Sequence, residues 1–260
     1  MDSSPFSKTW INPCKNRFQK VKKKNQKKDK RREKLLLCSF CGKREPVFFR
    51  RYSGEKLCKP CFLSSVENKV RKTISKYGMF KIDDRIAVAV SGGKDSLSLL
   101  NILHKIEKKF PKASLFALTV NEGITNRSEE AVNNVKEACE RLNIEYVVAS
   151  FKEFYGFTMD EIVKKIKDKK GELTPCSYCG VLRRKIVNKV AKELGATKVA
   201  TAHTLDDEVQ TIFLNFIHGD IFRAFRVAPK LENETGMFIQ RVKPLCEIPQ
   251  EEITLYAYFK

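Results

Sequence analysis

The sequence predicts an α/β protein in which helices cover both faces of a parallel sheet, with a small metal-binding ribbon ahead of it. Two observations predict the sheet. Short apolar segments alternate with amphipathic ones from residue 85 onward, and a glycine-rich turn directly follows the first apolar segment. One observation predicts the ribbon: two CxxC pairs precede the alternating region.

The chain is strongly basic, which suggests a polyanionic partner such as RNA. It carries 51 Lys and Arg against 31 Asp and Glu in 260 residues, a formal charge of +20. Its 42% hydrophobic content is sufficient for a buried core. It has neither the run of about 20 apolar residues that spans a bilayer nor a signal peptide, so we expect a cytoplasmic protein without a membrane partner.

Residues 1–37 are predicted to form a disordered basic arm. Twelve Lys and Arg and only two acidic residues lie between Lys15 and Lys34, with no apolar periodicity. The arm could contact RNA, or it could be a solubilising or targeting-like tail. The sequence leaves both open.

Residues 38–64 are predicted to form a zinc ribbon. VFFRRY and GEKL form a plausible hairpin with its turn at Ser53–Gly54. Two tight CxxC turns can place four thiolates around one ion, which closes the coordination shell and makes the zinc structural. The predicted ligands are Cys38, Cys41, Cys58 and Cys61.

The remaining chain divides into a linking helix, residues 65–80, and a catalytic domain, residues 81–260. The helix is indicated by apolar residues at helical spacing from Leu63 to Ile74. Strands are predicted at 85–90, 114–120, 144–150 and 198–202, and helices follow them, near 94–109, 128–142, 158–169, 178–194 and 205–217.

The turn after the first strand has the composition of a phosphate-binding loop. Its glycines let the backbone approach an anion, and the helix that follows offers free N–H groups and the positive end of its dipole. Lys94 adds a cation, and Asp95 could orient Mg²⁺ or the substrate. The loop comprises Ser91, Gly92, Gly93, Lys94, Asp95 and Ser96. It lacks the spacing of a Walker A loop.

SGGKDS after a strand resembles the PP-loop of ATP pyrophosphatases, which adenylate a carbonyl oxygen with ATP and let a nucleophile displace AMP. Three more segments resemble the TtcA/TtuA-type tRNA 2-thiouridine synthetases. They are PCSYCG with the following Arg183 and Arg184, TAHTLDDE from Thr201, and RVKPL from Arg241. In the second, Ala202 and Thr204 depart from the usual Gly and Asn. The ribbon matches the TtuA branch and the archaeal and eukaryotic cytoplasmic tRNA 2-thiolation proteins.

The resemblance implies that Cys176 and Cys179 ligate a [4Fe-4S] cluster held by three protein thiolates. Without the resemblance, this CxxC could equally be a redox-active pair. The third ligand is expected either at Cys246 or beyond the end of the chain, which we interpret as truncated because YAYFK ends within a predicted helix.

The resemblance also assigns roles to single residues. ATP is expected over the loop, with adenine near Thr119–Asn121 and with His203 near the nucleotide. Arg183 is suited to a phosphate or the target nucleotide, although a solvated helix face is the alternative. Asp207 is expected to act in catalysis, and both Asp206 and Asp207 are also candidates to cap the helix that they begin. Cys139, Cys14, His104 and His218 receive no role.

The predicted function is therefore an adenylating tRNA sulfurtransferase that makes 2-thiouridine at the wobble position, using ATP, Mg²⁺, Zn²⁺ and the cluster. The sulfur would come from a thiocarboxylated ubiquitin-like carrier or from sulfide. The alternatives are thiolation of a T-loop uridine, another PP-loop reaction such as cytidine thiolation, and a non-catalytic zinc-ribbon RNA-binding protein. Whether the chain forms a homodimer is left open.

Overall fold

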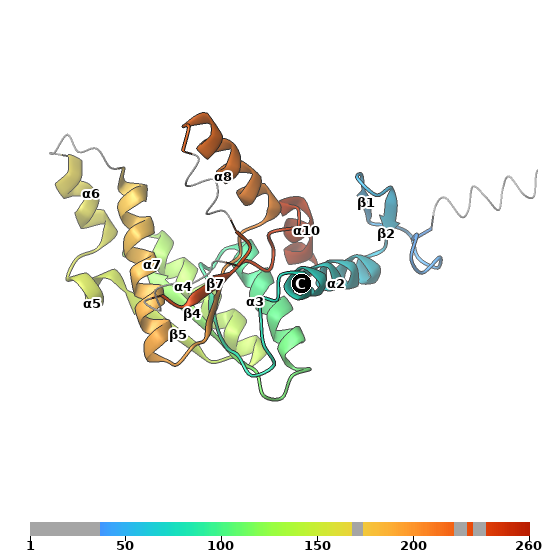
Figure 1. Cartoon of the computed structure of the whole chain (residues 1–260), viewed down its shortest axis with the longest axis horizontal. Coiled ribbons are helices and arrows are strands. Elements are labelled where there is room, and N and C mark those ends of the chain that lie inside the picture. Colours follow the sequence, from blue (N-terminus) through green and yellow to red (C-terminus); the bar gives the residue numbers. More distant parts are fainter. Residues whose placement is uncertain (1–36, 168–173, 221–227, 231–237) are drawn as a thin grey trace, which may run out of the picture. The chain divides into compact units, whose positions relative to one another are not determined.

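The computed structural model describes residues 37–167, 174–220, 228–230 and 238–260 (Figure 1). The predicted basic arm lies outside this part of the chain, except for residue 37. The chain divides into two compact units, residues 1–64 and 65–260, with the boundary inside helix α2 (Lys59–Lys76). No helix in the described ranges is long and apolar enough to cross a membrane.

The first unit contains the predicted hairpin. Strands β1 (Phe48–Arg50) and β2 (Glu55–Leu57) pair antiparallel, with Phe48 opposite Leu57. Gly54, at φ +69°, closes the turn by donating its N–H to the carbonyl of Arg50 at 2.8 Å. Glycine suits this position because the left-handed region is unfavourable for residues with a Cβ. The rings of Phe48 and Phe62 pack edge to face, with their centroids 4.9 Å apart.

The second unit is built on a five-stranded parallel sheet in the order β5-β4-β3-β6-β7, which confirms the predicted fold class. Its strands are β3 (Arg85–Ala89), β4 (Ser114–Asn121), β5 (Tyr146–Ser150), β6 (Lys198–Ala200) and β7 (Gln240–Val242). Strand β7 was not predicted. Its register is set by β6, where the Lys198 ammonium also donates to the Gln240 side-chain oxygen at 2.6 Å.

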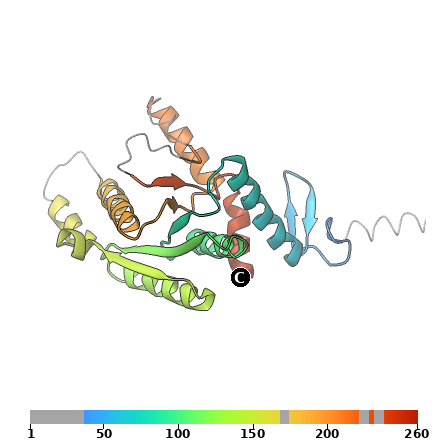
Figure 2. The same cartoon turned by 60° about the horizontal axis from the view of Figure 1, so that its bottom comes forward.

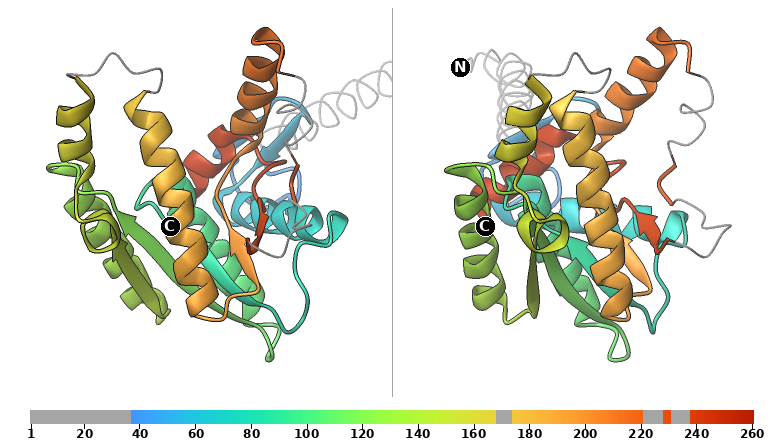
Figure 3. Two further views of the ribbon diagram at one scale, coloured as in Figure 1. Left: turned by 60° about the vertical axis from the view of Figure 1, so that its left-hand side comes forward. Right: turned by 90° about the vertical axis from the view of Figure 1, so that its left-hand side faces the viewer.

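Helices lie on both faces of this sheet, as predicted. The helices that follow β3 are α3 (Lys94–Glu107), α4 (Arg127–Leu142), α5 (Phe151–Tyr155), α6 (Met159–Lys167), α7 (Pro175–Glu193), α8 (Leu205–Ile217) and α10 (Gln250–Phe259), of which α8 projects away from the sheet (Figure 1). Figure 2 shows α4 and α7 on opposite sides of the strands, and Figure 3 shows α6 beside α7. The five-residue α5 was not predicted.

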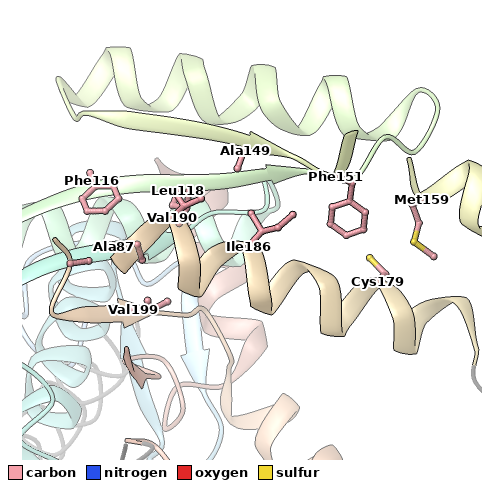
Figure 4. Close-up of a cluster of buried hydrophobic side chains, with 12 residues drawn as sticks. Ala87, Phe116, Leu118, Ala149, Phe151, Met159, Cys179, Ile186, Val190 and Val199 are labelled. Carbon is pink, nitrogen blue, oxygen red and sulfur yellow. The ribbon is translucent and has the colours of Figure 1, made fainter. Parts of the chain in front are cut away.

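One core lies between the sheet and α7 (Figure 4). Phe116 and Leu118 on β4 are about 1% exposed, and Ile186 on α7 is fully buried against this layer. Such burial is worth roughly 1.5–3 kcal/mol for each large apolar side chain. The packing fixes α7 on the sheet and thereby fixes the side chains at its N-terminal end.

The strand order places a ligand-binding position at one point of the sheet. From β3 the chain runs outward through β4 to β5, and it then returns to the other side of β3 through β6 and β7. Ligands of open parallel sheets bind beyond the carboxyl ends of the strands where the order reverses. Here that point lies between the ends of β3 and β6.

Candidate functional site

The loop that follows β3 has the geometry of an anion cradle. Helix α3 begins at Lys94 with Gly93 as its N-cap, and no side chain caps it. The first-turn N–H groups of a helix have no partner within the helix, so they remain available to a phosphate. Ser96 holds the loop closed, because its Oγ accepts from the Ser91 N–H at 3.1 Å and donates to the Gly93 carbonyl at 2.9 Å.

Gly92 is required at its position for two reasons. Its φ of +75° lies in the left-handed region, and a Cβ built there would meet the Ala131 carbonyl oxygen at 2.4 Å. The backbone of α4 therefore approaches the loop too closely for any side chain. Gly93 differs, because its φ is −86° and a Cβ there would lie 3.6 Å from its nearest neighbour, the Ser91 hydroxyl.

Lys94 and Asp95, the two charged loop residues, pair with each other. The Lys94 ammonium lies 2.8 Å from the Asp95 carboxylate, and the two side chains are 40% and 29% exposed. Such an exposed pair is held by at most about 1 kcal/mol. A nucleotide phosphate or a divalent cation can therefore separate the two groups and recruit each of them.

The loop after β4 is ordered by its own side chains. The Asn121 side-chain oxygen accepts from the Gly123 N–H at 2.8 Å, which turns the chain immediately after the strand. Asn121, predicted to lie near adenine, thus shapes this strand end. The next residue, Glu122, was not singled out from the sequence, yet its carboxylate lies 2.9 Å from the Arg183 Nε.

The two cysteines of PCSYCG open helix α7, three residues earlier than the predicted start of that helix. Thr174 is the N-cap and accepts from the Ser177 N–H, and Pro175 occupies the first turn. Cys176 is exposed, whereas Cys179 is buried beside Phe151 and Met159 (Figure 4). Spacing of three residues places the two sulfurs near one face of the helix. Two soft thiol donors there suit a cluster iron.

Arg183 lies one turn after Cys179 and donates from Nη2 to its Sγ at 3.1 Å. It therefore contacts a predicted cluster ligand directly. From the sequence we expected a phosphate or the target nucleotide as its partner, or a solvated face. In the structure the guanidinium joins the Cys179 sulfur to the Glu122 carboxylate.

Cys246 lies apart from this pair. It is 4% exposed, and burial together with the nearby Glu247 and Glu208 raises the pKa of its thiol to about 11. In the described ranges the ribbon set is the only group of three or more potential metal ligands close enough together to hold one ion. Cys246 therefore does not form such a group with Cys176 and Cys179 in the structure.

His203 follows β6 at the reversal point of the sheet. Its Nδ1 lies 3.0 Å from the Thr201 hydroxyl. His203 remains exposed at the surface, but surrounding atoms remove part of its hydration. This loss and the nearby Lys243 cation lower the pKa of His203, which favours the neutral imidazole. Lys243 itself pairs with Glu208 at 2.8 Å, and both side chains are about nine-tenths buried.

The two aspartates of TAHTLDDE both make helix-capping contacts. Asp207 Oδ2 accepts from the backbone N–H and the hydroxyl of Thr204, completing a capping box at the start of α8. Asp206 Oδ2 accepts from the Gln250 N–H at the start of α10, 2.6 Å away. Both aspartates were candidates to cap α8. Asp207 does so, whereas Asp206 contacts the first turn of α10 instead.

The ribbon cysteines fit a tetrahedral thiolate site. All four ligand atoms lie within 4.8 Å of one another, and the sulfurs of Cys41 and Cys58 are 3.8 Å apart. A tetrahedral zinc site with Zn–S bonds of about 2.3 Å requires sulfurs about 3.8 Å apart. Burial and the neighbouring thiols raise the pKa of Cys61 to about 12. A divalent cation bound between the four sulfurs would offset the repulsion between their thiolate forms.

Comparison with known proteins agrees with this architecture. Residues 63–260 match the family described as PP-loop domain, and residues 37–63 match the 2-thiouridine synthetase TtuA, N-terminal LIM domain. The chain is similar to the U34-tRNA thiolase NcsA from Methanococcus maripaludis with its [4Fe-4S] cluster. That structure shares 35% identity and a TM-score of 0.75, over 86% of this chain and 71% of the other.

Curated relatives agree with these matches. A probable sulfurtransferase of Methanocaldococcus jannaschii is 38% identical over 86% of this chain, and the cytoplasmic tRNA 2-thiolation protein 1 of Dictyostelium discoideum is 38% identical over 88%. The chain spans 64% and 62% of the length of these two relatives. The tRNA 2-thiolation protein NcsA of Haloferax volcanii is 37% identical over 86% of this chain and 72% of its own length. Fold, loop and ribbon together with these matches show that the chain belongs to the PP-loop family of tRNA 2-thiolation proteins.

Proposed function

We propose that this chain is an ATP-dependent tRNA sulfurtransferase that adenylates a uridine and replaces its 2-oxygen with sulfur. The observation that carries the proposal is the uncapped N-terminus of α3 next to the close-packed Gly92, at the reversal point of the sheet. The names of the relatives support the choice of tRNA as substrate and of the cytoplasm as location. Similarity to a U34-tRNA thiolase supports uridine 34, the wobble position, as the target.

In the first step the uridine O2 attacks the α-phosphorus of ATP and pyrophosphate leaves. The first-turn N–H groups of α3 and the Lys94 ammonium stabilise the negative charge that builds on the phosphates. Asp95, freed from Lys94, supplies a carboxylate oxygen suited to Mg²⁺. His203 is positioned by its contact with Thr201, and its lowered pKa favours the neutral imidazole, which can donate to or accept from the nucleotide.

In the second step a sulfur nucleophile attacks C2 and AMP leaves. Hydrosulfide gives the thiocarbonyl directly, with its proton passing to solvent. A protein thiocarboxylate first bonds to C2 through its sulfur, and water then hydrolyses the acyl–sulfur bond and releases the carrier as a carboxylate. In both cases the sulfur is already at the sulfide level, so the exchange needs no oxidant or reductant. A bound [4Fe-4S] cluster would supply an iron to hold that sulfur. Cys176 and Cys179 are the residues that would ligate it, and Arg183 would hold the Cys179 sulfur in place.

The test is an anaerobic assay. The protein reconstituted with iron and sulfide is given ATP, sulfide and unmodified tRNA, and the digested RNA is analysed by mass spectrometry. We expect 2-thiouridine that depends on ATP, with activity lost in Asp95→Asn and Cys176→Ser. Asp83→Asn is the matched control, because Asp83 is an exposed aspartate ahead of β3.

The products separate the alternatives. Thiolated uridine in a wobble fragment supports the proposal, whereas thiolation in a T-loop fragment or of cytidine moves the activity to another target. ATP cleavage to AMP without thiolation would indicate that the protein catalyses a different PP-loop reaction. No ATP cleavage, with tRNA still bound, would support a non-catalytic RNA-binding protein.

A further inference from the structure

The Arg183 guanidinium connects two elements that are far apart in the sequence. From α7 it reaches the Cys179 sulfur through Nη2 at 3.1 Å, and it reaches Glu122, just past the end of β4, through Nε at 2.9 Å. The two contacts use different nitrogens of one planar group. Because a guanidinium is a rigid fork, fixing one nitrogen on the carboxylate also fixes the direction of the other.

Glu122 is placed to hold this fork firmly. Its side chain is 17% exposed, compared with 46% for Arg183, so the pair is screened less than a surface ion pair. Among the described residues, Glu122 is the carboxylate that pairs with Arg183, so removing it takes away the anchor that aims Nη2 at the sulfur. The Arg183 side chain has several rotatable bonds, so without this anchor other rotamers would compete with its contact to the Cys179 sulfur.

The backbone around Glu122 is itself clamped by α6. The Glu122 carbonyl accepts from the Met159 N–H at 2.8 Å, and Asp160 accepts from both the N–H and the hydroxyl of Thr125. Gly123 has φ +70°, and a Cβ there would lie 2.6 Å from Thr158. The carboxylate therefore extends from a loop that neighbouring residues fix on two sides.

Cys179 is the more buried cysteine of the pair, in the core layer with Phe151 and Met159 (Figure 4). An anionic or metal-bound sulfur in such an apolar setting needs a donor to offset lost hydration. Arg183 is the side-chain donor to this sulfur in the described part of the chain. The same contact would add a positive charge beside a ligand of the cluster.

We propose that Glu122 is a positioning residue that holds the Arg183 guanidinium on the Cys179 sulfur and thereby retains the [4Fe-4S] cluster and tunes its reduction potential. The inference rests on the proposed function only in that Cys179 ligates the cluster. It assigns Arg183 primarily to the ligand sulfur and Glu122 to the orientation of Arg183. Hydrogen bonds and charge next to cluster sulfurs set the potential, so both quantities are measurable.

The experiment is a double-mutant cycle on the full chain. Wild type, Glu122→Gln, Arg183→Gln and the double variant are reconstituted anaerobically. Bound iron and sulfide, the rate of cluster loss to a chelator, and the midpoint potential followed by electron paramagnetic resonance are measured for each. Glu193→Gln is the matched control, because Glu193 lies on the same helix in an exposed pair with Lys189. Thermal unfolding of each protein checks the fold.

We expect Glu122→Gln to accelerate cluster loss about fivefold when Arg183 is present and less than about twofold when Arg183 is Gln. Arg183→Gln should lower the midpoint potential, because a cation that stabilises the reduced cluster is lost. Arg183→Lys should fall between wild type and Arg183→Gln, since an ammonium lacks the fork that reaches both partners. Glu193→Gln should match wild type.

Equal effects of Glu122→Gln in the two backgrounds, or no effect in either, would overturn the inference. An equal effect of Glu193→Gln would overturn it as well, because net charge alone would then explain the result. A wild type that takes up no iron and sulfide also overturns it. A protein that holds the cluster with the expected coupling but makes no thiouridine supports the inference while rejecting the proposed reaction.

Discussion

The hydroxyl of Thr204 lies 2.9 Å from the carboxylate of Asp207, which also accepts from the Thr204 N–H at 2.7 Å. Thr204 is completely buried and begins α8 at the position where the resembling family has Asn. Both residue types are good N-caps, because each offers a side-chain oxygen to the free N–H groups of the first turn. The departure from the family pattern therefore preserves the start of the helix.

Replacing this cap should reduce stability without a large change in shape. We expect Thr204→Ala to lower the free energy of unfolding by about 1 kcal/mol, and Thr204→Asn to stay within about 0.5 kcal/mol of wild type. Urea unfolding measures both. Thr254→Ala is the control, because the Thr254 hydroxyl only bonds back to a carbonyl inside α10. Equal losses for Thr204→Ala and Thr204→Asn would show that the cap is not the cause.

The two loop glycines should differ strongly in their response to the same substitution. Gly92→Ala places a methyl group 2.4 Å from the Ala131 carbonyl at a positive φ, so the loop or α4 must move. We expect a loss of about 2 kcal/mol or more in stability and at least tenfold weaker ATP binding.

Gly93→Ala is the matched control for this pair. Its φ of −86° suits alanine and its closest neighbour would be 3.6 Å away, so stability should change by less than about 1 kcal/mol. Calorimetry of ATP binding and thermal unfolding compare the variants. Similar behaviour of the two would contradict the close approach of α4 to Gly92.

His203 should contribute a pH dependence to stability. Loss of hydration and the Lys243 cation lower the pKa of His203 below its ordinary value of 6.5, so the unfolded chain binds a proton more readily than the folded one. Stability is then fully present above about pH 6.5 and is lost as the pH falls through the folded pKa.

Urea unfolding between pH 7.5 and 5.5 measures this loss, and His203→Gln should reduce it. Lys243→Gln should raise the folded pKa of His203 in a proton NMR titration. That variant removes a cation and leaves the Glu208 carboxylate unpaired, and both changes favour the charged imidazole. A His203 pKa at or above 6.5 in the wild type would refute the effect.

The ribbon should bind zinc stoichiometrically. Its four thiols lie within 4.8 Å of one another, so metal analysis should find about one zinc ion per chain. Cys38→Ser or Cys61→Ser should lose that ion, and a strong chelator under reducing conditions should expose the remaining ribbon thiols to alkylation. Cys139→Ser is the control, since Cys139 is a buried thiol on α4 outside the ribbon. Retention of zinc in Cys61→Ser would argue against a four-thiolate shell.

Most elements could be predicted from the sequence, including the three-residue strands β1, β2 and β6, whereas β7 and α5 could not. Helix α8 has the predicted bounds, 205–217, because its capping residues mark the start of the helix and its length makes the helical period recognisable. Strand β7 and helix α5 span three and five residues, too few to establish a period. Strand β7 exists because β6 offers it a parallel edge, which depends on the whole sheet.

The candidate site shows the same division. Its loop could be predicted because the glycines, lysine and aspartate adjoin one another in the chain. The partners of Arg183 and Asp207 could not, since residue type indicates that a side chain is charged but not which atoms it meets. Glu122 was missed because a glutamate after a strand resembles any surface carboxylate until α7 brings Arg183 to it.

The sequence by itself determined the α/β class, the hairpin with its cysteine pairs and the phosphate-binding loop, because each depends on local conformational preferences and on spacing along the chain. Only the tertiary structure decided that α4 forbids a side chain at Gly92, that Asp206 serves α10, and that Glu122 and Arg183 meet at Cys179. Those relationships depend on how helices pack across the sheet. Packing brings together residues whose separation in the chain carries no information about their distance in space.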